Sequence, residues 1–131
     1  MVLMVIDMKV NGEMINLNEK EYIIIIKSHI EEDRYEGEWR NDKREGKGIY
    51  YFNNGDRYEG DWRNGKKEGK GITYHNNGGR YEGDFRNDKY EGKGIYYWND
   101  GDREMGDYFN DEPIGMHITL TNNRKVKTNN Y

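Results

Sequence analysis

Few residues of the chain have the types and spacing of an enzyme site. Ser28 is the only serine and lies next to His29, but adjacent residues of a strand point to opposite faces, so the two do not form a nucleophile and its base. The other histidines, His75 and His117, would lie about 19 Å apart in a stacked sheet, which is too far for them to share a metal ion. Cysteine is absent, which excludes disulfides and thiolate metal sites.

Two short stretches resemble ligand-binding loops without their defining residues. GKKEGKGIT, residues 65–73, has Gly71 where a phosphate-binding loop has Ser or Thr, and its glycines are too closely spaced. NNGD at 53–56 and NDGD at 99–102 lack the alternating acidic ligands and the closing glutamate of a calcium loop. We therefore expect no catalytic residues, no metal, no cofactor and no enzyme activity.

Composition narrows the class of protein further. The 131 residues suggest one domain, and although only 33% are hydrophobic, aromatic residues reach 14% and can form a core. The net charge of −4 mixes 21 basic with 25 acidic residues, which argues against nucleic acid as a partner. The first ten residues lack the basic front and cleavage site of a signal peptide, and no apolar run is long enough for a membrane span. We expect a soluble cytoplasmic protein.

A repeat of 23 residues organises most of the chain and must position any functional side chain. Its copies are YEGEWRNDKREGKGIYYFNNGDR at 35–57, YEGDWRNGKKEGKGITYHNNGGR at 58–80 and YEGDFRNDKYEGKGIYYWNDGDR at 81–103. A degenerate fourth copy spans 104–126, with Glu104 replacing the leading tyrosine and His117 replacing a glycine. A fixed period of this length predicts a stacked array. Residues 1–34 are interpreted as an N-terminal β cap or partial repeat, and 127–131 as a C-terminal tail.

Each copy contains two strand signals. In YEGEWR, alternation places Tyr35, Gly37 and Trp39 on one face and charges on the other, and KGIYYF alternates in the same way. We interpret NDKREG as a polar connection and NNGD as a turn between units. Glycines between the rings would prevent side chains from pushing them apart. The predicted fold class is all-β, an elongated single-layer antiparallel sheet of stacked hairpins. MVLMVIDMKV and EYIIIIKSH predict a further N-terminal hairpin, and residues 23–34 could be half a repeat.

The unit resembles the MORN repeat, named for membrane occupation and recognition nexus. The resemblance is carried by YEGEW, YEGDW and YEGDF, each followed by EGKG and an NG or DG turn. It implies stacked β-hairpins and a scaffolding role in cytoskeletal, ciliary or membrane-associated assemblies. Phosphoinositide binding is often proposed for such repeats.

We interpret the protein as a non-catalytic scaffold that binds other proteins or a second copy of itself, as a subunit of a larger complex. Our candidate contact residues lie on the ring-bearing face, where Thr73 and His75 form a less aromatic notch: Tyr35, Trp39, Tyr50, Phe52, Tyr58, Trp62, His75, Tyr81, Phe85, Tyr96 and Trp98. An alternative is peripheral contact with anionic lipid through Arg40, Lys47, Arg63, Lys70, Arg86 and Lys93, although interleaved glutamates weaken it. A carbohydrate- or choline-binding repeat is a third possibility.

Overall fold

The computed structural model describes the backbone of residues 5–10 and 13–18 and all atoms of 33–131. The chain divides into two units, Met1–Glu32 and Asp33–Tyr131. In the first unit, β1 (Val5–Val10) and β2 (Glu13–Asn18) form an antiparallel hairpin. A hairpin is therefore present at the N-terminus as predicted, but the strand that pairs with β1 is Glu13–Asn18, which lies between the two predicted strands. The predicted strand EYIIIIKSH lies outside the described residues, as does most of the half repeat at 23–34.

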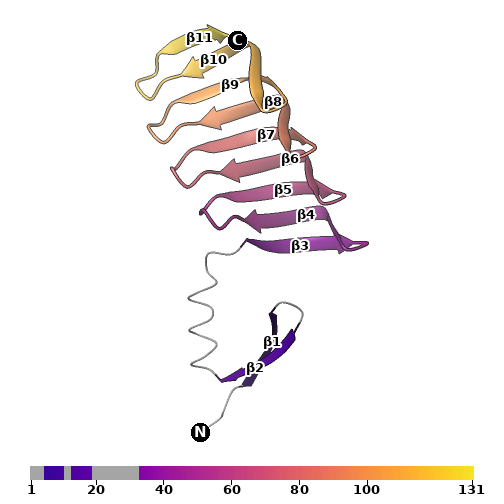
Figure 1. Ribbon diagram of the computed structural model, residues 1–131. Helices are drawn as coiled ribbons and strands as arrows, with labels where there is room; N and C mark the ends of the chain where they lie inside the picture. The colour runs from indigo at the N-terminus through magenta and orange to yellow at the C-terminus, as the bar shows by residue number, and fades with distance from the viewer. Residues whose placement is uncertain (1–4, 11–12, 19–32) are drawn as a thin grey trace. The chain divides into compact units, whose positions relative to one another are not determined.

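The second unit is one open antiparallel sheet whose strands pair in the order of the sequence (Figure 1). This confirms the predicted fold class, since every element of the described residues is a strand. The strands are β3 (Arg34–Arg40), β4 (Lys43–Tyr51), β5 (Arg57–Arg63), β6 (Lys66–Tyr74), β7 (Arg80–Arg86), β8 (Lys89–Tyr97), β9 (Arg103–Phe109), β10 (Glu112–Leu120) and β11 (Val126–Asn130).

The turn inside each repeat is tighter than the sequence pattern suggested. Asn41 and Asp42, at φ of 50° and 60°, alone connect β3 to β4, and Arg40 pairs directly with Lys43. Two residues at positive φ form the type I′ turn, whose twist matches that of the flanking strands. The interpretation of NDKREG as a connection was therefore wrong, because its last four residues belong to β4.

A bulge in each second strand absorbs the additional residues. Gly37 pairs with Gly48, but Trp39 pairs with Arg44 rather than Gly46, so the register shifts by two residues. Gly46, at φ of 67°, sits in this bulge and pairs with Trp62 on the other side. The shift recurs between the two strands of each of the four repeats, and in the first it returns the ring of Trp39 and the side chain of Arg44 to the same face.

The longer turns between repeats are held together by a ladder of side chains. Asp33 accepts a hydrogen bond from the backbone N–H of Asn53 at 2.8 Å, and Asp56 accepts one from Asn76 at the same distance. Asp102 does the same for Asn122. Each of these aspartates therefore ties one turn to the next, and the second repeat has Gly79 at the corresponding position.

The array continues past the fourth copy. Val126–Asn130 pairs with β10 in the register by which β9 pairs with β8, and Tyr131 takes the place of Tyr108. Tyr131 exchanges backbone hydrogen bonds with Gly115, at 2.9 Å and 3.2 Å. Residues 127–131 are therefore not a separate tail: Val126–Asn130 is the first strand of a fifth unit, and Tyr131 follows it beside Gly115.

Aromatic rings packed along one face make the core. Tyr58 and Tyr81 are fully buried, and Trp62, Phe85 and Tyr108 are at most 8% exposed. Each leading tyrosine lies across a cross-strand pair of glycines and donates its hydroxyl to the carbonyl three residues later, at 2.8 Å for Tyr58 and Asp61. A β-carbon at Gly60 would lie 2.5 Å from the Cα of Gly71. The glycines thus make room for the facing strand and the tyrosine, rather than separating tyrosine from tryptophan.

Candidate interaction groove

The ring-bearing face, where sequence reasoning placed the partner contacts, is largely internal to the sheet. Its buried members Tyr58, Trp62, Tyr81 and Phe85 contact one another edge to face, with centroids 4.9–5.3 Å apart. Tyr35, Tyr50, Phe52 and Tyr96 are half-buried against this cluster. Trp39, 61% exposed, and Trp98, 47% exposed, are the two exposed candidates.

The notch at Thr73 and His75 is filled from the next repeat. The Tyr90 ring stacks on Tyr81 with centroids 3.7 Å apart, and its hydroxyl lies 3.2 Å from Nε2 of His75. His75 also stacks on Tyr96. The preceding repeats carry Arg44 and Lys67 where Tyr90 stands, so a change in one repeat is matched by a change in the next.

Those two cations lie over the rings. The guanidinium of Arg44 is 4.6 Å from the centroid of Trp62, and Nζ of Lys67 is 5.0 Å from that of Tyr58. Burial lowers the pKa of Lys67, while burial raises the pKa of Tyr58 and of Tyr81. This face therefore has the features of a core, with cation–π contacts that cover the rings.

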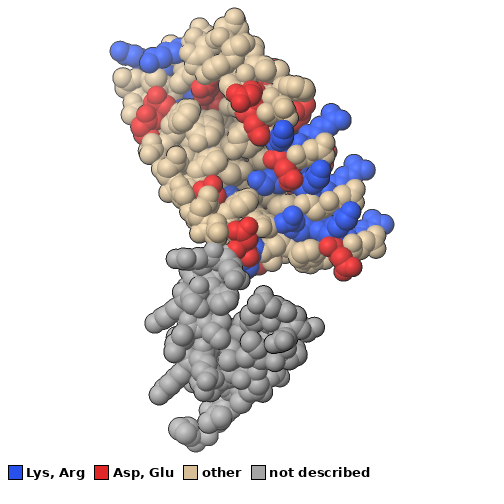
Figure 2. All heavy atoms as spheres, in the orientation of Figure 1, with Lys and Arg blue, Asp and Glu red and all other residues tan. Residues whose placement is uncertain are grey.

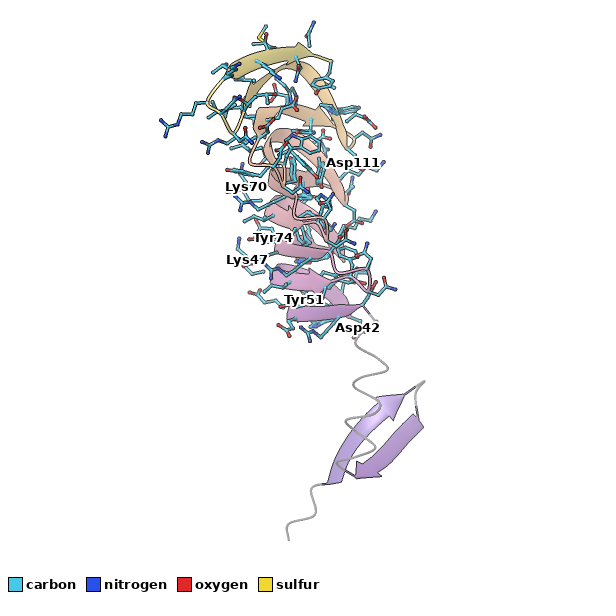
Figure 3. All side chains as sticks on the ribbon, turned by 90° about the vertical axis from the view of Figure 1, so that its left-hand side faces the viewer. Asp42, Lys47, Tyr51, Lys70, Tyr74 and Asp111 are labelled. Atoms are coloured by element: carbon cyan, nitrogen blue, oxygen red, sulfur yellow. The ribbon has the colours of Figure 1, made fainter. Side chains whose placement is uncertain are left out.

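The opposite face carries a groove of about 1090 Å³ that runs across the strands from β4 to β10. Its floor is the backbone of the paired glycines, such as Gly48 and Gly60. One wall is formed by Ile49, Ile72, Ile95 and Ile118, with glutamates between them, and the other by Lys47, Lys70 and Lys93. The labelled Lys47 and Lys70 extend from the same side of the ribbon in Figure 3.

Ion pairs neutralise both walls. Lys47 pairs with Asp61 and Lys70 with Asp84 across adjacent strands, and Lys93 lies 3.5 Å from Asp107. Beyond the isoleucines, Arg57 lies 4.0 Å from Glu59 and stacks over Tyr74 at 4.2 Å. Charge therefore flanks the groove in balanced pairs, and its exposed apolar surface is aliphatic.

The six lipid-binding candidates occupy two separate places. Lys47, Lys70 and Lys93 are in the groove wall, each beside an aspartate. Arg40, Arg63 and Arg86 are exposed at the type I′ turns, on the margin where Figure 2 shows Lys and Arg gathered on the right. Glu45, Glu68 and Glu91 lie beside these turns and accept backbone hydrogen bonds from Asn64, Asn87 and Asn110.

Sequence reasoning missed the groove although its signal was present. Ile49, Ile72, Ile95 and Ile118 recur every 23 residues and stand in all four copies, including the degenerate one. An aliphatic side chain that recurs on a face otherwise occupied by charged residues indicates an apolar surface of the kind found at interaction sites. The rings drew attention because of their size, but in an open sheet the large side chains must supply the core.

Among the described residues, no group of three or more His, Asp or Glu side chains is close enough to hold a metal ion. In the same part of the chain there is no helix with the length and hydropathy of a membrane span.

His29 lies outside the described residues. His117 is fully buried, with Nδ1 3.2 Å from a carboxylate oxygen of Glu104 and Nε2 donating to the carbonyl of Asp107 at 2.8 Å.

Fold and groove together define a class: open sheets built from stacked β-hairpins with a glycine-floored channel across their strands. The MORN repeat model matches residues 35–57, 58–80 and 81–103, more than half of the chain. The chain therefore belongs to the MORN repeat family. A comparison with curated proteins gives no significant match.

Proposed function

We propose that the protein is a non-catalytic scaffold that holds a segment of another protein in the groove. The observation that carries this proposal is the aliphatic row of Ile49, Ile72, Ile95 and Ile118 over a floor without side chains. Elongated apolar channels between polar walls are typical of peptide-recognition surfaces. A role as a subunit of a larger cytoskeletal or ciliary assembly in the cytoplasm is part of the same proposal.

The spacing of the groove suits an amphipathic helix. Equivalent residues in successive repeats are two strands apart, about 9.6 Å. Seven residues of α-helix rise about 10.5 Å, so apolar residues repeated every seven positions would meet successive isoleucines. From β4 to β10 the groove spans about 29 Å, the length of roughly 19 helical residues.

The charged walls give such a helix a preferred orientation. Glu36, Glu59 and Glu82 lie along the isoleucine side, and Lys47, Lys70 and Lys93 lie along the other. A helix with basic residues on one flank of its apolar stripe and acidic residues on the other would complement both walls. Complementary charges at the rim mainly set orientation and association rate, while burial of aliphatic surface supplies affinity.

A displayed library of amphipathic 20-residue peptides, selected on the full chain, tests the proposal. We expect enrichment of sequences with apolar residues at seven-residue intervals, and loss of their binding in the variant Ile72→Lys. Trp98→Ser, on the opposite face, is the matched control and should leave binding unchanged. Binding that survives Ile72→Lys but is lost with Trp98→Ser would refute the groove and favour the ring-bearing face.

Anionic lipid is the second candidate, favoured by the exposed margin of Arg40, Lys43, Arg63, Lys66, Arg86 and Lys89. The ion pairs of the groove lysines weigh against it. Flotation with phosphatidylcholine vesicles containing phosphoinositide separates the two candidates. We expect no binding at physiological salt. Binding that is lost when Arg40, Arg63 and Arg86 are changed to serine would support the lipid function instead.

A further inference from the structure

Each type I′ turn of the first three repeats is flanked by two basic residues that face each other across the strands. The cross-strand pairs are Arg40 with Lys43, Arg63 with Lys66 and Arg86 with Lys89. All six side chains are exposed, on the margin of the sheet where Figure 2 shows Lys and Arg gathered. We call these six residues the basic margin.

The pairing of like charges in the basic margin is unfavourable. The β-carbons of residues directly opposite each other lie about 5 Å apart, and like charges at such positions destabilise a hairpin. No ion pair within the described part of the chain includes any of the six side chains, although Lys89 donates to the amide oxygen of Asn110 at 2.8 Å. The groove lysines, in contrast, face aspartates, as Lys70 faces Asp84. A bound anion would turn three unfavourable pairs into favourable contacts.

The glutamates between successive turns do not neutralise these cations, because the backbone already uses them. Glu68 is half-buried and accepts the backbone N–H of Asn87 at 3.2 Å. It lies in a pocket of about 420 Å³ together with Arg63, Lys66 and Arg86. Three positive charges therefore surround one negative charge that is held by a backbone amide, and this excess favours an anionic ligand.

We propose that the basic margin binds an extended acidic segment of a partner protein, with one carboxylate between the two cations of each repeat. A carboxylate has two oxygens, so it can accept from the guanidinium of the arginine and from the ammonium of the lysine at once. This site lies at the type I′ turns and is separate from the aliphatic groove. The scaffold would then hold two different kinds of segment, one apolar and one acidic.

The spacing of the turns selects the conformation of the segment. Equivalent turns are two strands apart, about 9.6 Å. A polyproline II chain has three residues per turn and rises about 3.1 Å per residue, so every third side chain points the same way at intervals of about 9.3 Å. In a β-strand the third side chain points to the opposite face, and in an α-helix the matching interval is seven residues, about 10.5 Å. The closest match is therefore a polyproline II segment with acidic residues at i, i+3 and i+6.

The alternation of charge along the margin favours a peptide over a continuous anionic surface. Between the cation pairs lie the half-buried glutamates Glu45, Glu68 and Glu91. A membrane would bring anionic head groups against these glutamates, whereas a peptide can place neutral residues opposite them. In the fourth repeat the corresponding pair is Phe109 and Glu112, so the site ends after three carboxylates.

Fluorescence anisotropy with two labelled peptides of the same composition, titrated with the full chain, tests the proposal. One peptide has the sequence EPPEPPEPP, and the other, EEEPPPPPP, has its three glutamates together. We expect the spaced peptide to bind about fivefold more tightly or better, and its affinity to fall as salt is added, because the contacts are ionic. Equal affinity for the two peptides, or no binding of the spaced one at low salt, overturns the proposal.

Two double variants with the same change in net charge locate the site. Arg63→Gln with Arg86→Gln should weaken binding of the spaced peptide about fivefold or more, because two of the three carboxylates lose their bidentate partner. Lys125→Gln with Lys127→Gln removes two exposed lysines far from these turns and should change the affinity less than about twofold. Circular dichroism checks that both variants keep the fold. Equal losses in the two variants would indicate general charge attraction and overturn the proposal.

Two further measurements separate this site from the other candidates. Ile72→Lys should leave binding of the spaced peptide unchanged, so failure of the basic margin and failure of the groove are distinguishable. Flotation with phosphoinositide vesicles covers the lipid alternative. Vesicle binding that is lost in Arg63→Gln with Arg86→Gln, without binding of either peptide, would assign the margin to lipid and overturn the proposal.

Discussion

The three matched repeats and the last hairpin have the same backbone arrangement, but different side chains, from different strands, fill the space over the glycines. In the matched repeats, a tyrosine from the first strand lies across two glycines and donates to a carbonyl, as Tyr81 does to that of Asp84 at 3.0 Å. In the last hairpin, His117 of the second strand fills the same volume and donates to the equivalent carbonyl of Asp107. The array therefore requires a flat hydrogen-bonding ring at this place, whichever strand provides it.

The groove face of the sheet also differs between the matched repeats and the last hairpin. The matched repeats keep balanced ion pairs such as Lys70 and Asp84, which suit a surface in water. The last hairpin presents Met105, Phe109 and Met116 instead. Because the backbone is conserved while the surface changes, one sheet can carry two different surfaces along its length.

The largest effect should come from closing the space beneath a tyrosine in the matched repeats. In Gly60→Ala, the new methyl group would lie 2.5 Å from the Cα of Gly71 and from the carbonyl oxygen of Lys70. Backbone cannot move aside as a side chain can, so we expect a loss of about 3 kcal/mol or more in urea unfolding. Gly65→Asp is the control, because nothing lies within 4 Å and other repeats have aspartate there. Equal losses for both variants would contradict the steric account.

A double-mutant cycle tests the exchange between tyrosine and histidine directly. Glu104→Tyr should clash with His117, and His117→Gly should leave a void beside a buried carboxylate, so each alone should destabilise by about 2–4 kcal/mol. The double variant restores the pattern of the matched repeats and should recover most of this loss. We expect a coupling free energy on the order of 2 kcal/mol from chemical denaturation. Additive effects would show that the two positions do not share one volume.

Alkaline pH should weaken the ring-bearing core. Unfolded tyrosines ionise near the ordinary pKa of 10.0, whereas burial raises the pKa of Tyr108 to about 12 and raises those of Tyr58 and Tyr81 as well. Between these values the folded state keeps protons that the unfolded state has released, so stability falls as pH rises above 10.

We expect a loss on the order of 1–2 kcal/mol by pH 12 for each such tyrosine, measured from urea midpoints. Tyr108→Phe copies the residue of the third repeat, Phe85, and should make this dependence shallower. A midpoint independent of pH above 10 would contradict burial of the phenols.

The smallest effect concerns the one turn that lacks its aspartate. Gly79→Asp should let the new carboxylate accept the N–H of Asn99, as Asp56 does for Asn76. The new β-carbon would approach the hydroxyl of Tyr96 at 2.8 Å, but the tip of that ring can shift, and in the first repeat Tyr50 donates to Asp33. We expect a gain of about 0.5–1 kcal/mol. Asp56→Gly, the reverse change, should lose a similar amount; a less stable Gly79→Asp chain would refute the ladder.

Much of the fold followed from the sequence because its pattern is local and repeated. The 23-residue period, the alternation in YEGEWR and the Asn-Gly turns predicted stacked hairpins in an open sheet, and the structure confirms them. The extent of NDKREG was misjudged although Asn64-Gly65, the corresponding residues of the second copy, are the dipeptide typical of a two-residue type I′ turn. The bulge that follows has a weaker signal, a single glycine such as Gly46. The fifth unit was missed because only Tyr131 retains the pattern.

The candidate site was less predictable, since the surface available to a partner depends on which face becomes the core. By itself the sequence determined the strands, their order and the ring-over-glycine packing, because each depends on contacts between neighbouring units of similar sequence. Only the tertiary structure decided that most of the rings are buried in the core and that Ile49 and its equivalents line a groove. The tertiary structure also decided which face of the last hairpin is apolar and which is polar. The physical reason is that the burial of a side chain depends on the neighbouring repeats of the sheet and not on its own repeat alone.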